Sequence, residues 1–412
     1  MAEKPTIRIL ALDDEPLMLR LLARMLANLG FTDVVTCDNG YAALEQVDSP
    51  GKPPDLILLD LNMPEMDGVE FVRRLAEHRY AGSLVLVSGE DERMLQATVK
   101  LVQAHKIPVL GHLRKPATPE GLKILLDKWA QPQQGRPQAE KIYGAGEVHA
   151  AIRNGELVNY YQPKVEIATG QVVGVETLVR WKNLMDGLVF PDRFIGVAEA
   201  HGLIDELTRT VLSEALAQAK VWQEMGLALK VAINVSMDNL ASLDFADYVA
   251  KQAAMAGVPP QQVILEVTES QLMRDLRAPL EILTRLRLKR FRLSIDDFGT
   301  GHSSLAQLRD IPFDELKIDQ SFVHGAWDNG TARAMFDASL GLAKQLDMKI
   351  VAEGVEDLDD WNFLRNTKCD IAQGYFIAKP MPAADFPGWM EGWQSRVQQY
   401  LPAGTIAVKK QS

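Results

Sequence analysis

Short apolar runs alternate with stretches of helical periodicity along the whole chain. In the N-terminal third the apolar runs read IRILALDD, DVVTCDNG, DLILLDLNMP, SLVLVSGE and IPVLGHLRKP. Between the first two runs, leucines and methionines recur at helical spacing from Leu17 to Leu29, after Pro16 and before Gly30. Five strands that alternate with helices predict a parallel sheet, and we expect a flavodoxin-like (βα)5 domain over residues 6–130.

A second and longer alternation follows a polar segment. Residues 131–140 read QPQQGRPQAE, and we interpret residues 131–145 as a linker. The strand candidates after it are VNYYQPKVEI, QVVGVETLVRW, KVAINVS, VILEVTE, RLSIDDFG, ELKIDQSF, KIVAEGVE and AQGYFIAKP. Eight strands with helical spacers predict a TIM-like (β/α)8 barrel over residues 146–400, with a loose tail over 401–412.

Composition and charge narrow the classes of function. A chain of 412 residues is too long for one core, and its net charge of -11 disfavours bulk binding of nucleic acid. Its two cysteines, Cys37 and Cys369, suggest a reducing compartment. The N-terminus lacks an apolar signal core, and no apolar run approaches the length of about 18 residues that spans a membrane. We expect a cytoplasmic protein that binds neither DNA nor a membrane.

Polar residues stand where the strands of the first domain end. They are Asp13, Asp14, Asp60, Ser88 and Lys115. In a flavodoxin-like sheet the first and third strands are neighbours, so the three carboxylates should converge and bind one Mg²⁺ ion. A carboxylate nucleophile, a lysine and a hydroxyl together suit the acceptance of a phosphoryl group. One such acid alone could equally be a helix cap, but five polar residues together favour the phosphoryl site.

These residues lie in motifs that resemble the receiver domain of two-component response regulators. The matching motifs are LDDEP, LLDLNMPEMDG and LRKP. The resemblance implies that Asp60 is phosphorylated by a sensor histidine kinase, while Asp13 and Asp14 help it to hold the metal. It also implies a switch formed by Ser88, His112 and Lys115. His112 stands where a Tyr or Phe is usual, and Gly89 stands where Ala is common, so we expect these differences to affect transmission of the signal and not the chemistry at Asp60.

The second domain contains an acidic pair at a strand end, in LSIDDFGTGHSSL. Adjacent carboxylates repel each other and lose solvation when buried, so folding does not require them. Oxygen-donor side chains end the other candidate strands as well, and this end of a barrel carries active sites. The set is Glu176, Asn234, Glu266, Asp296, Asp297 and Glu353. Without His or Cys, it suits Mg²⁺ or Mn²⁺ rather than zinc, and two ions about 3.5–4 Å apart would suit phosphodiester hydrolysis.

Other residues extend this set. Lys317 is the single cation among these residues. Beside two divalent ions the pKa of Lys317 should fall, which favours a role in the activation of water. The alternative is that Lys317 only forms a structural ion pair. Arg180 suits a substrate phosphate. FGTGHSS is expected to be a mobile loop that Glu269 anchors, unless Glu269 only caps a helix or lies on the surface. For Gln373, taken alone, a structural role is favoured.

The second domain resembles the EAL domains, a family of cyclic di-GMP phosphodiesterases. The motifs are ETLVRW, NVS, EVTE, DDFGTG, KID, AEGVE and QGY. The resemblance implies metal-dependent opening of cyclic di-GMP to linear pGpG, with the six oxygen donors as ligands of two ions. It assigns the chemistry to Glu176, Asp297, Glu269 and Lys317, and substrate contacts to Gln162, Arg180 and Gln373. Thr177 replaces the Ala of the signature triplet, and His302 replaces the usual loop Tyr.

The layout of receiver followed by EAL domain resembles the RocR-type regulators, which favours a phosphodiesterase whose rate the receiver sets. The rival is a catalytically weak EAL module that acts as a cyclic di-GMP receptor or as a protein-interaction adaptor. No ligand residue is missing and Lys317 is present, which favours activity. No GGDEF signature and no DNA-binding domain follow the receiver. Family resemblance alone suggests a homo-oligomer.

Overall fold

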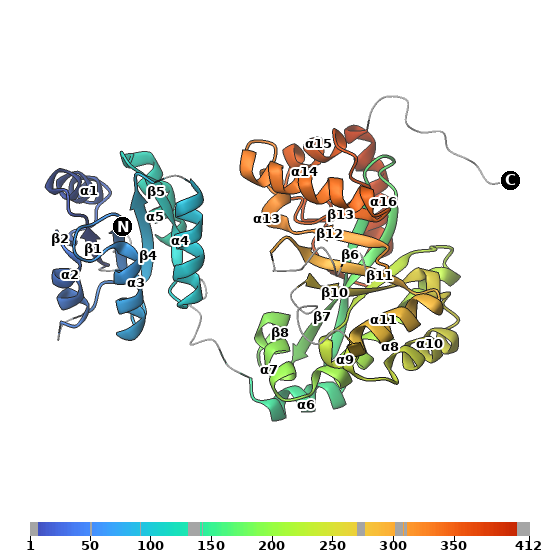
Figure 1. The fold of residues 1–412 in the computed structure, drawn as a ribbon. Coiled ribbons are helices and arrows are strands. Elements are labelled where there is room, and N and C mark those ends of the chain that lie inside the picture. Colours follow the sequence, from blue (N-terminus) through green and yellow to red (C-terminus); the bar gives the residue numbers. More distant parts are fainter. Residues whose placement is uncertain are drawn as a thin grey trace. The chain divides into compact units, whose positions relative to one another are not determined.

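The computed structural model describes residues 7–49, 52–90, 92–130, 141, 143–269, 277–300, 308 and 311–401. The chain divides into two compact units, Met1–Glu140 and Lys141–Ser412 (Figure 1). The segment 131–140, within the predicted linker, and residues 402–412 of the predicted tail lie outside the described residues. Within the described ranges, no helix is long and apolar enough to cross a membrane.

The first unit is a five-stranded parallel sheet with helices on both faces. The strand order is β2-β1-β3-β4-β5, which confirms the flavodoxin-like prediction. The strands are β1 (Arg8–Leu12), β2 (Asp33–Cys37), β3 (Leu56–Asp60), β4 (Ser83–Ser88) and β5 (Val109–Arg114). The helices are α1 (Pro16–Asn28), α2 (Gly40–Val47), α3 (Gly68–Glu77), α4 (Glu92–Ala104) and α5 (Pro119–Ala130).

Alternate residues of each strand supply two separate cores. In β1, Leu10 and Leu12 pack with residues of α2, α3 and α4, whereas Ile9 and Ala11 pack with residues of α1 and α5. Successive side chains of a strand point to opposite faces, and a sheet covered on both faces needs apolar residues at both. This explains why the strands read as continuous apolar runs and why their polar ends stand out.

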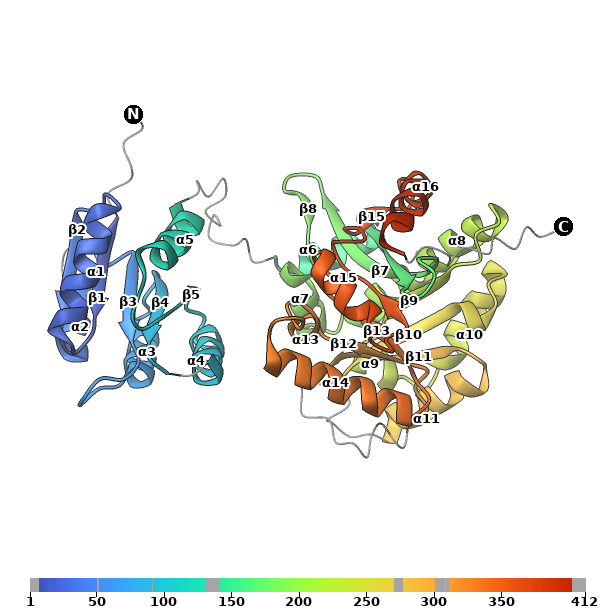
Figure 2. The same ribbon diagram turned by 90° about the horizontal axis from the view of Figure 1, so that it is seen from above.

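The second unit contains an eight-stranded barrel. The order β6-β14-β13-β12-β11-β10-β9-β7 closes through pairing of β6 with β7, and the short strands β15 and β8 flank it (Figure 2). The strands are β6 (Leu157–Glu166), β7 (Val172–Asn183), β8 (Gly187–Val189), β9 (Lys230–Asn234), β10 (Val263–Thr268), β11 (Arg292–Phe298), β12 (Glu315–Ile318), β13 (Lys349–Ala352), β14 (Ile371–Ala372) and β15 (Met381–Pro382).

Helices surround the barrel. They are α6 (Ala145–Arg153), α7 (Ile195–Ala200), α8 (Ile204–Glu224), α9 (Met237–Ala241), α10 (Phe245–Ala256), α11 (Arg277–Leu288), α13 (Gln320–Val323), α14 (Gly330–Gln345), α15 (Leu358–Arg365) and α16 (Phe386–Val397). One large apolar cluster joins strand residues such as Leu265 and Leu316 to helix residues such as Leu283 and Phe336. The alternate strand positions Glu266 and Lys317 are buried but polar, so the barrel interior gathers charged groups.

Two details differ from the predicted regular barrel. The first two strands form an antiparallel hairpin, β6 with β7, instead of being joined by a helix. Only five residues, 167–171, separate them, which is too short for a crossover helix. The eighth strand, β14, ends at Ala372, before most of the predicted strand AQGYFIAKP. There Gly374 passes so close to the backbone of Val355 that a Cβ atom would lie 2.2 Å from Val355 N, which only Gly permits.

Candidate functional site

The first unit holds a compact charged cluster at the end of its sheet. Asp13 directly follows β1, and Asp60 ends β3. Lys115 Nζ lies 2.8 Å from Asp13 Oδ2 and 2.9 Å from Asp60 Oδ2. Asp13, Asp14 and Asp60 each offer an oxygen within 4.8 Å of the others, a donor set that suits a hard cation. Burial raises the pKa of Asp60 even though Lys115 opposes this, and a cation bound here would favour the charged carboxylate.

The predicted switch residues lie at the same end of this sheet. Ser88 is fully buried at the end of β4, and its Oγ accepts a hydrogen bond from the backbone of Glu90 at 3.2 Å. The backbone N–H of Lys115 donates to Ser88 O at 2.8 Å, which fixes Lys115 beside Ser88. His112 is half-buried on β5, where it pairs in register with Leu86 of β4. The structure thus brings Ser88 and Lys115 to the cluster of Asp13, Asp14 and Asp60, with His112 further back on β5.

The six predicted oxygen donors of the second unit come together at the ends of the barrel strands. The carboxylates form two triplets, and within each triplet the oxygens lie within 4.8 Å of one another. One triplet is Glu176, Glu266 and Asp296, and the other is Asp296, Asp297 and Glu353. Asn234 joins them, since its Nδ2 donates to Glu176 Oε1 at 3.2 Å. We call these six residues the acidic ring. Its two triplets share Asp296 and contain only oxygen donors, which fits two hard divalent cations.

An irregularity in β11 allows both members of the Asp pair to reach the ring. Neighbouring residues of a regular strand point to opposite faces. The register of β11 with β12 shifts between Ile295 and Phe298, and Asp297 has a left-handed backbone with φ of 54°. Burial, reinforced by the charge of Asp296, raises the pKa of Asp297 to about 6. Crowding of charge and an unusual backbone therefore coincide at this pair.

Lys317 lies at the centre of the ring and is fully buried. Its Nζ lies 2.7 Å from Glu353 Oε1, 3.0 Å from Asp296 Oδ2, 3.2 Å from Glu266 Oε2 and 3.4 Å from Glu176 Oε2. Burial opposes the charged ammonium, yet the carboxylates around it, led by Asp296 and Glu176, hold the pKa of Lys317 well above its usual value. The fall in pKa expected beside metal ions concerns a different, metal-bound state of this site.

Two glutamines position Glu176. Gln373 Nε2 donates to Glu176 Oε2 at 2.5 Å and to Gln162 Oε1 at 3.0 Å, and Gln162 pairs in register with Glu176. Burial would raise the pKa of Glu176, but Lys317 and Lys164 outweigh it and the pKa falls to about 2. In this structure Gln373 contacts a ring carboxylate and Gln162 contacts Gln373, whereas the resemblance assigned both glutamines to substrate.

Arg180 lies on β7, four residues after Glu176, and contacts two aromatic side chains. Its guanidinium carbon lies 5.0 Å from the ring centroid of Phe190 and 5.6 Å from that of Tyr160. Stacked on two aromatic rings, the guanidinium has a defined orientation.

Glu269 contacts the segment that follows the Asp pair. Its Oε2 accepts a hydrogen bond from Gly299 N at 2.6 Å, and Glu269 itself is buried. Gly299 has φ of 98°, and a Cβ atom there would lie 2.5 Å from the ring of Phe322, so this position requires Gly. Residues 301–307, which include His302 and most of the predicted mobile loop, lie outside the described residues.

Sequence reasoning overlooked Lys164, a buried residue of β6. Its Nζ lies 2.5 Å from Glu266 Oε1, and the side chains of Lys164 and Glu266 are 2% and 0% exposed. The sequence contained an indication that Lys164 faces the barrel interior, because it follows Gln162 by two residues and so lies on the same face of the strand. A lysine in a strand is nevertheless usually expected to face solvent, so Lys164 was not predicted to belong to the site.

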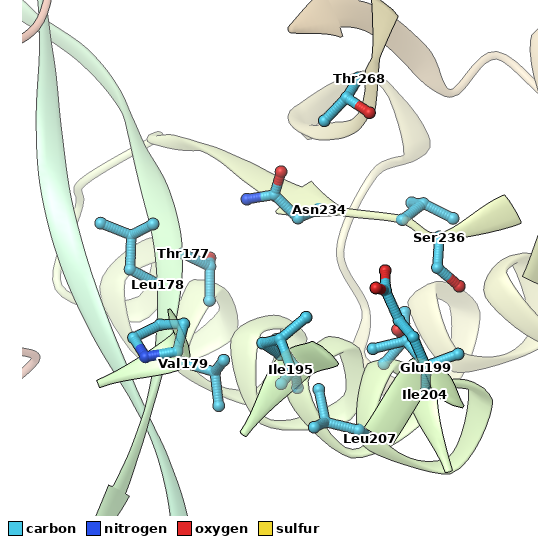
Figure 3. Close-up of a pocket in the computed structure, with 14 residues that line it drawn as sticks. Thr177, Leu178, Val179, Ile195, Glu199, Ile204, Leu207, Asn234, Ser236 and Thr268 are labelled. Carbon is cyan, nitrogen blue, oxygen red and sulfur yellow. The ribbon is translucent and has the colours of Figure 1, made fainter. Parts of the chain in front are cut away.

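A cavity of about 310 Å³ adjoins the ring between β7, β9 and helices α7 and α8 (Figure 3). Asn234 of the ring and Thr177 belong to its lining, together with apolar residues such as Leu178, Ile195 and Leu207. Glu199 directs its carboxylate toward the side on which Asn234 and Ser236 lie (Figure 3). The hydroxyl of Thr177 is buried without a hydrogen-bond partner among the described residues.

Comparison with known proteins gives two family matches. The EAL domain model matches residues 145–380, and the response regulator receiver domain model matches residues 9–127. The chain is 31% identical over 389 residues to the cyclic di-GMP phosphodiesterase RocR of Pseudomonas aeruginosa. The matched region covers 94% of this chain and 99% of RocR.

Two further relatives match the second unit alone. The bifunctional diguanylate cyclase/cyclic di-GMP phosphodiesterase MucR of Pseudomonas aeruginosa is 40% identical over 245 residues, 59% of this chain and 36% of MucR, so the chain spans about a third of that relative. A solved structure of the PaMucR phosphodiesterase in complex with c-di-GMP is 39% identical, with a TM-score of 0.56, and covers 58% of this chain and 98% of that one.

Proposed function

The chain belongs to the EAL domain family and carries a response regulator receiver domain, and on this premise we propose that it hydrolyses cyclic di-GMP to linear pGpG under control of the receiver. The acidic ring is the observation that carries the proposal. It retains six oxygen donors around a buried lysine, and a receptor that does not cut its ligand would not need all of them.

The ring residues would hold two Mg²⁺ or Mn²⁺ ions, and Asp296 belongs to both carboxylate triplets. When bound, these ions supply Lewis-acid polarisation of the phosphodiester and of the attacking water. The carboxylates that raise the pKa of Lys317 are those that would hold the ions. With their charge neutralised, the pKa of Lys317 would fall, and the neutral amine Nζ would be able to accept a proton from the attacking water. The water adds to phosphorus, one P–O bond of the cyclic ester breaks, and the leaving oxygen takes up a proton.

The remaining residues position the reaction. Gln373, itself held by Gln162, keeps Glu176 in place, and Glu269 holds the segment after Asp297. Arg180, oriented by Tyr160 and Phe190, suits a phosphate of the substrate.

The cavity beside the ring suits one base of the dinucleotide. Its apolar walls can cover the faces of a purine ring, and it opens next to Asn234, so a base bound there would keep its phosphate near the ring. The carboxylate of Glu199 can accept hydrogen bonds from the N1–H and amino group of guanine, which adenine cannot offer in that arrangement. The buried hydroxyl of Thr177 offers a further partner.

Product analysis tests the proposal. The purified chain is incubated with cyclic di-GMP and Mg²⁺, with and without excess EDTA, and the nucleotides are separated by chromatography. Linear pGpG should form only where free Mg²⁺ is present, and cyclic di-AMP should be cut much more slowly. Tight binding without any pGpG would instead favour the receptor alternative.

The receiver is predicted to regulate this activity through Asp60, phosphorylated by a histidine kinase. The two sites lie in separate units, so phosphorylation can act only by shifting the population of active barrel conformations. We expect beryllofluoride or acetyl phosphate to change wild-type turnover by roughly 5- to 150-fold, the usual range for coupled sites. Asp60→Asn should keep basal turnover and lose this response.

Asp33→Asn is the matched control, because Asp33 is exposed at the start of β2 and does not belong to the cluster of Asp13, Asp14, Asp60 and Lys115. It should respond as the wild type does. Equal responses of wild type and Asp60→Asn in steady-state assays would show that the receiver is not a phosphorylation switch for this enzyme.

Glu269→Ala should lower kcat and raise the Mg²⁺ concentration needed for activity, by about 10- to 100-fold, because Gly299 loses its hydrogen-bond acceptor next to the Asp pair. Glu269→Gln keeps an acceptor of the same length and should retain most activity. Turnover measured across Mg²⁺ concentrations checks this. Equal losses in both variants would argue that Glu269 acts through its charge and not through this hydrogen bond.

A further inference from the structure

Glu266 is the ring residue whose two carboxylate oxygens are held by two different lysines. Lys317 Nζ lies 3.2 Å from Oε2, and Lys164 Nζ lies 2.5 Å from Oε1. All three side chains are almost completely buried. A buried carboxylate needs a compensating charge, and here it has one on each side.

The two lysines differ in what else they touch. Lys317 also lies within 3.4 Å of Glu176, Asp296 and Glu353, so ions bound by the ring would compete with it for the same oxygens. Among the described residues, Lys164 forms an ion pair with Glu266 alone, through the oxygen that Lys317 does not contact. Lys164 can therefore keep its contact while Glu266 Oε2 serves a metal ion.

Strand geometry fixes Lys164 in this place. It lies on β6, whose Gln162 pairs with Glu176 of β7, and Lys164 pairs with Gly174 two residues further along. Gly174 has no side chain, and a Cβ atom there would lie 2.8 Å from Lys230 O, so the neighbouring strand passes closely at this level. The buried side chain of Lys164 therefore extends from β6 through the barrel interior to Glu266 of β10, where it contacts Oε1 and Lys317 contacts Oε2.

We propose that Lys164 is a positioning residue for the metal centre. It holds Glu266 Oε1, so that Oε2 faces the ring, and its ammonium balances the negative charge of the Glu266 carboxylate. This inference rests on the proposed function, because it assigns Glu266 to a metal ion. Ligands of metal ions are commonly oriented by such outer partners, and loss of one costs about 10- to 100-fold in metal affinity or activity.

A purely structural role makes a different prediction. If Lys164 only balances a buried charge for folding, its loss should lower the melting temperature and leave the metal affinity of the folded protein unchanged. If it positions Glu266, metal affinity and kcat should fall together, while the KM for cyclic di-GMP, which depends on other contacts, should change little.

The test compares Lys164→Met with Lys230→Met in the full chain. Lys230 is half-buried at the start of β9, at the other end of its strand from the ring residue Asn234, and is a matched loss of a lysine. Mn²⁺ affinity is measured by calorimetry without nucleotide, and kcat and KM are measured separately. Lys164→Met should bind Mn²⁺ about 10- to 100-fold more weakly with a similar loss in kcat, while Lys230→Met should match the wild type.

Wild-type Mn²⁺ affinity and kcat in folded Lys164→Met would overturn the inference while leaving the proposed function standing. If Lys164→Met does not fold, Lys164→Gln carries the same test, since Gln keeps a polar group at this position but its side chain is shorter than that of Lys and carries no charge to hold Oε1; it should show the weaker Mn²⁺ binding, and unchanged binding would overturn the inference. A wild-type protein that neither binds Mn²⁺ nor cuts cyclic di-GMP would overturn the proposed function and this inference with it.

Discussion

Glu176→Ala and Asp296→Asn are each expected to remove divalent-metal binding and turnover together. Asp296 belongs to both carboxylate triplets, so its replacement weakens both predicted ion sites at once. Glu176 accepts hydrogen bonds from Asn234 and Gln373, and its loss also removes one acceptor from each of those side chains. Loss of one ligand from a two-metal site should cost several kcal/mol of transition-state stabilisation, roughly 10³-fold or more in rate.

Calorimetry with Mn²⁺ and steady-state hydrolysis check this pair of variants. Asp337→Asn is a suitable control, because Asp337 is exposed on α14 and pairs only loosely with Arg333 at 3.8 Å. It should behave as the wild type. Turnover near the wild-type level in either ring variant would remove the basis for two-metal chemistry at this site.

Lys317→Ala is expected to separate binding from chemistry. The ammonium contacts ring carboxylates and belongs to the set that would surround the attacking water, so its loss should act on the chemical step. With Ca²⁺ present to balance the ring, the variant should bind cyclic di-GMP about as tightly as the wild type. With Mg²⁺ it should hydrolyse the ligand about 10²- to 10⁴-fold more slowly, the usual contribution of acid–base catalysis.

Lys220→Ala, on the outer helix α8, controls for loss of a lysine and should leave both quantities unchanged. Equilibrium binding measured in Ca²⁺ gives the affinity for cyclic di-GMP, and single-turnover hydrolysis in Mg²⁺ gives the rate of the chemical step. A Lys317→Ala protein that loses binding yet keeps kcat would identify Lys317 as a phosphate clamp and assign proton transfer elsewhere.

Most of the fold could be predicted because apolar periodicity reports directly on burial. The five strands of the first unit and the helix that begins at Pro16 follow from it. The antiparallel start of the barrel could not be predicted from this periodicity, because a strand pattern carries no direction. Only the short connection between β6 and β7 indicates it. The early end of β14 depends on the close approach of Gly374 to Val355, which no local pattern encodes.

The composition of the acidic ring could be predicted because parallel strands end at one edge, so their terminal polar residues must meet. Its geometry could not. Both members of the Asp pair reach the ring only through the register shift and the left-handed backbone at Asp297. The contact between Lys164 and Glu266 joins residues far apart in the sequence, and the partner of Gln373 is likewise set by packing across the barrel.

The dependence of turnover on Mg²⁺ tests the central claim most directly. Metal-stripped protein is titrated with Mg²⁺ at saturating cyclic di-GMP, and formation of pGpG is followed by chromatography. The acidic ring predicts no product without the ion, a rise with Mg²⁺ to a plateau, and full reversal by EDTA. Hydrolysis that proceeds without Mg²⁺, or the absence of pGpG at every Mg²⁺ concentration, would contradict a metal-dependent phosphodiesterase.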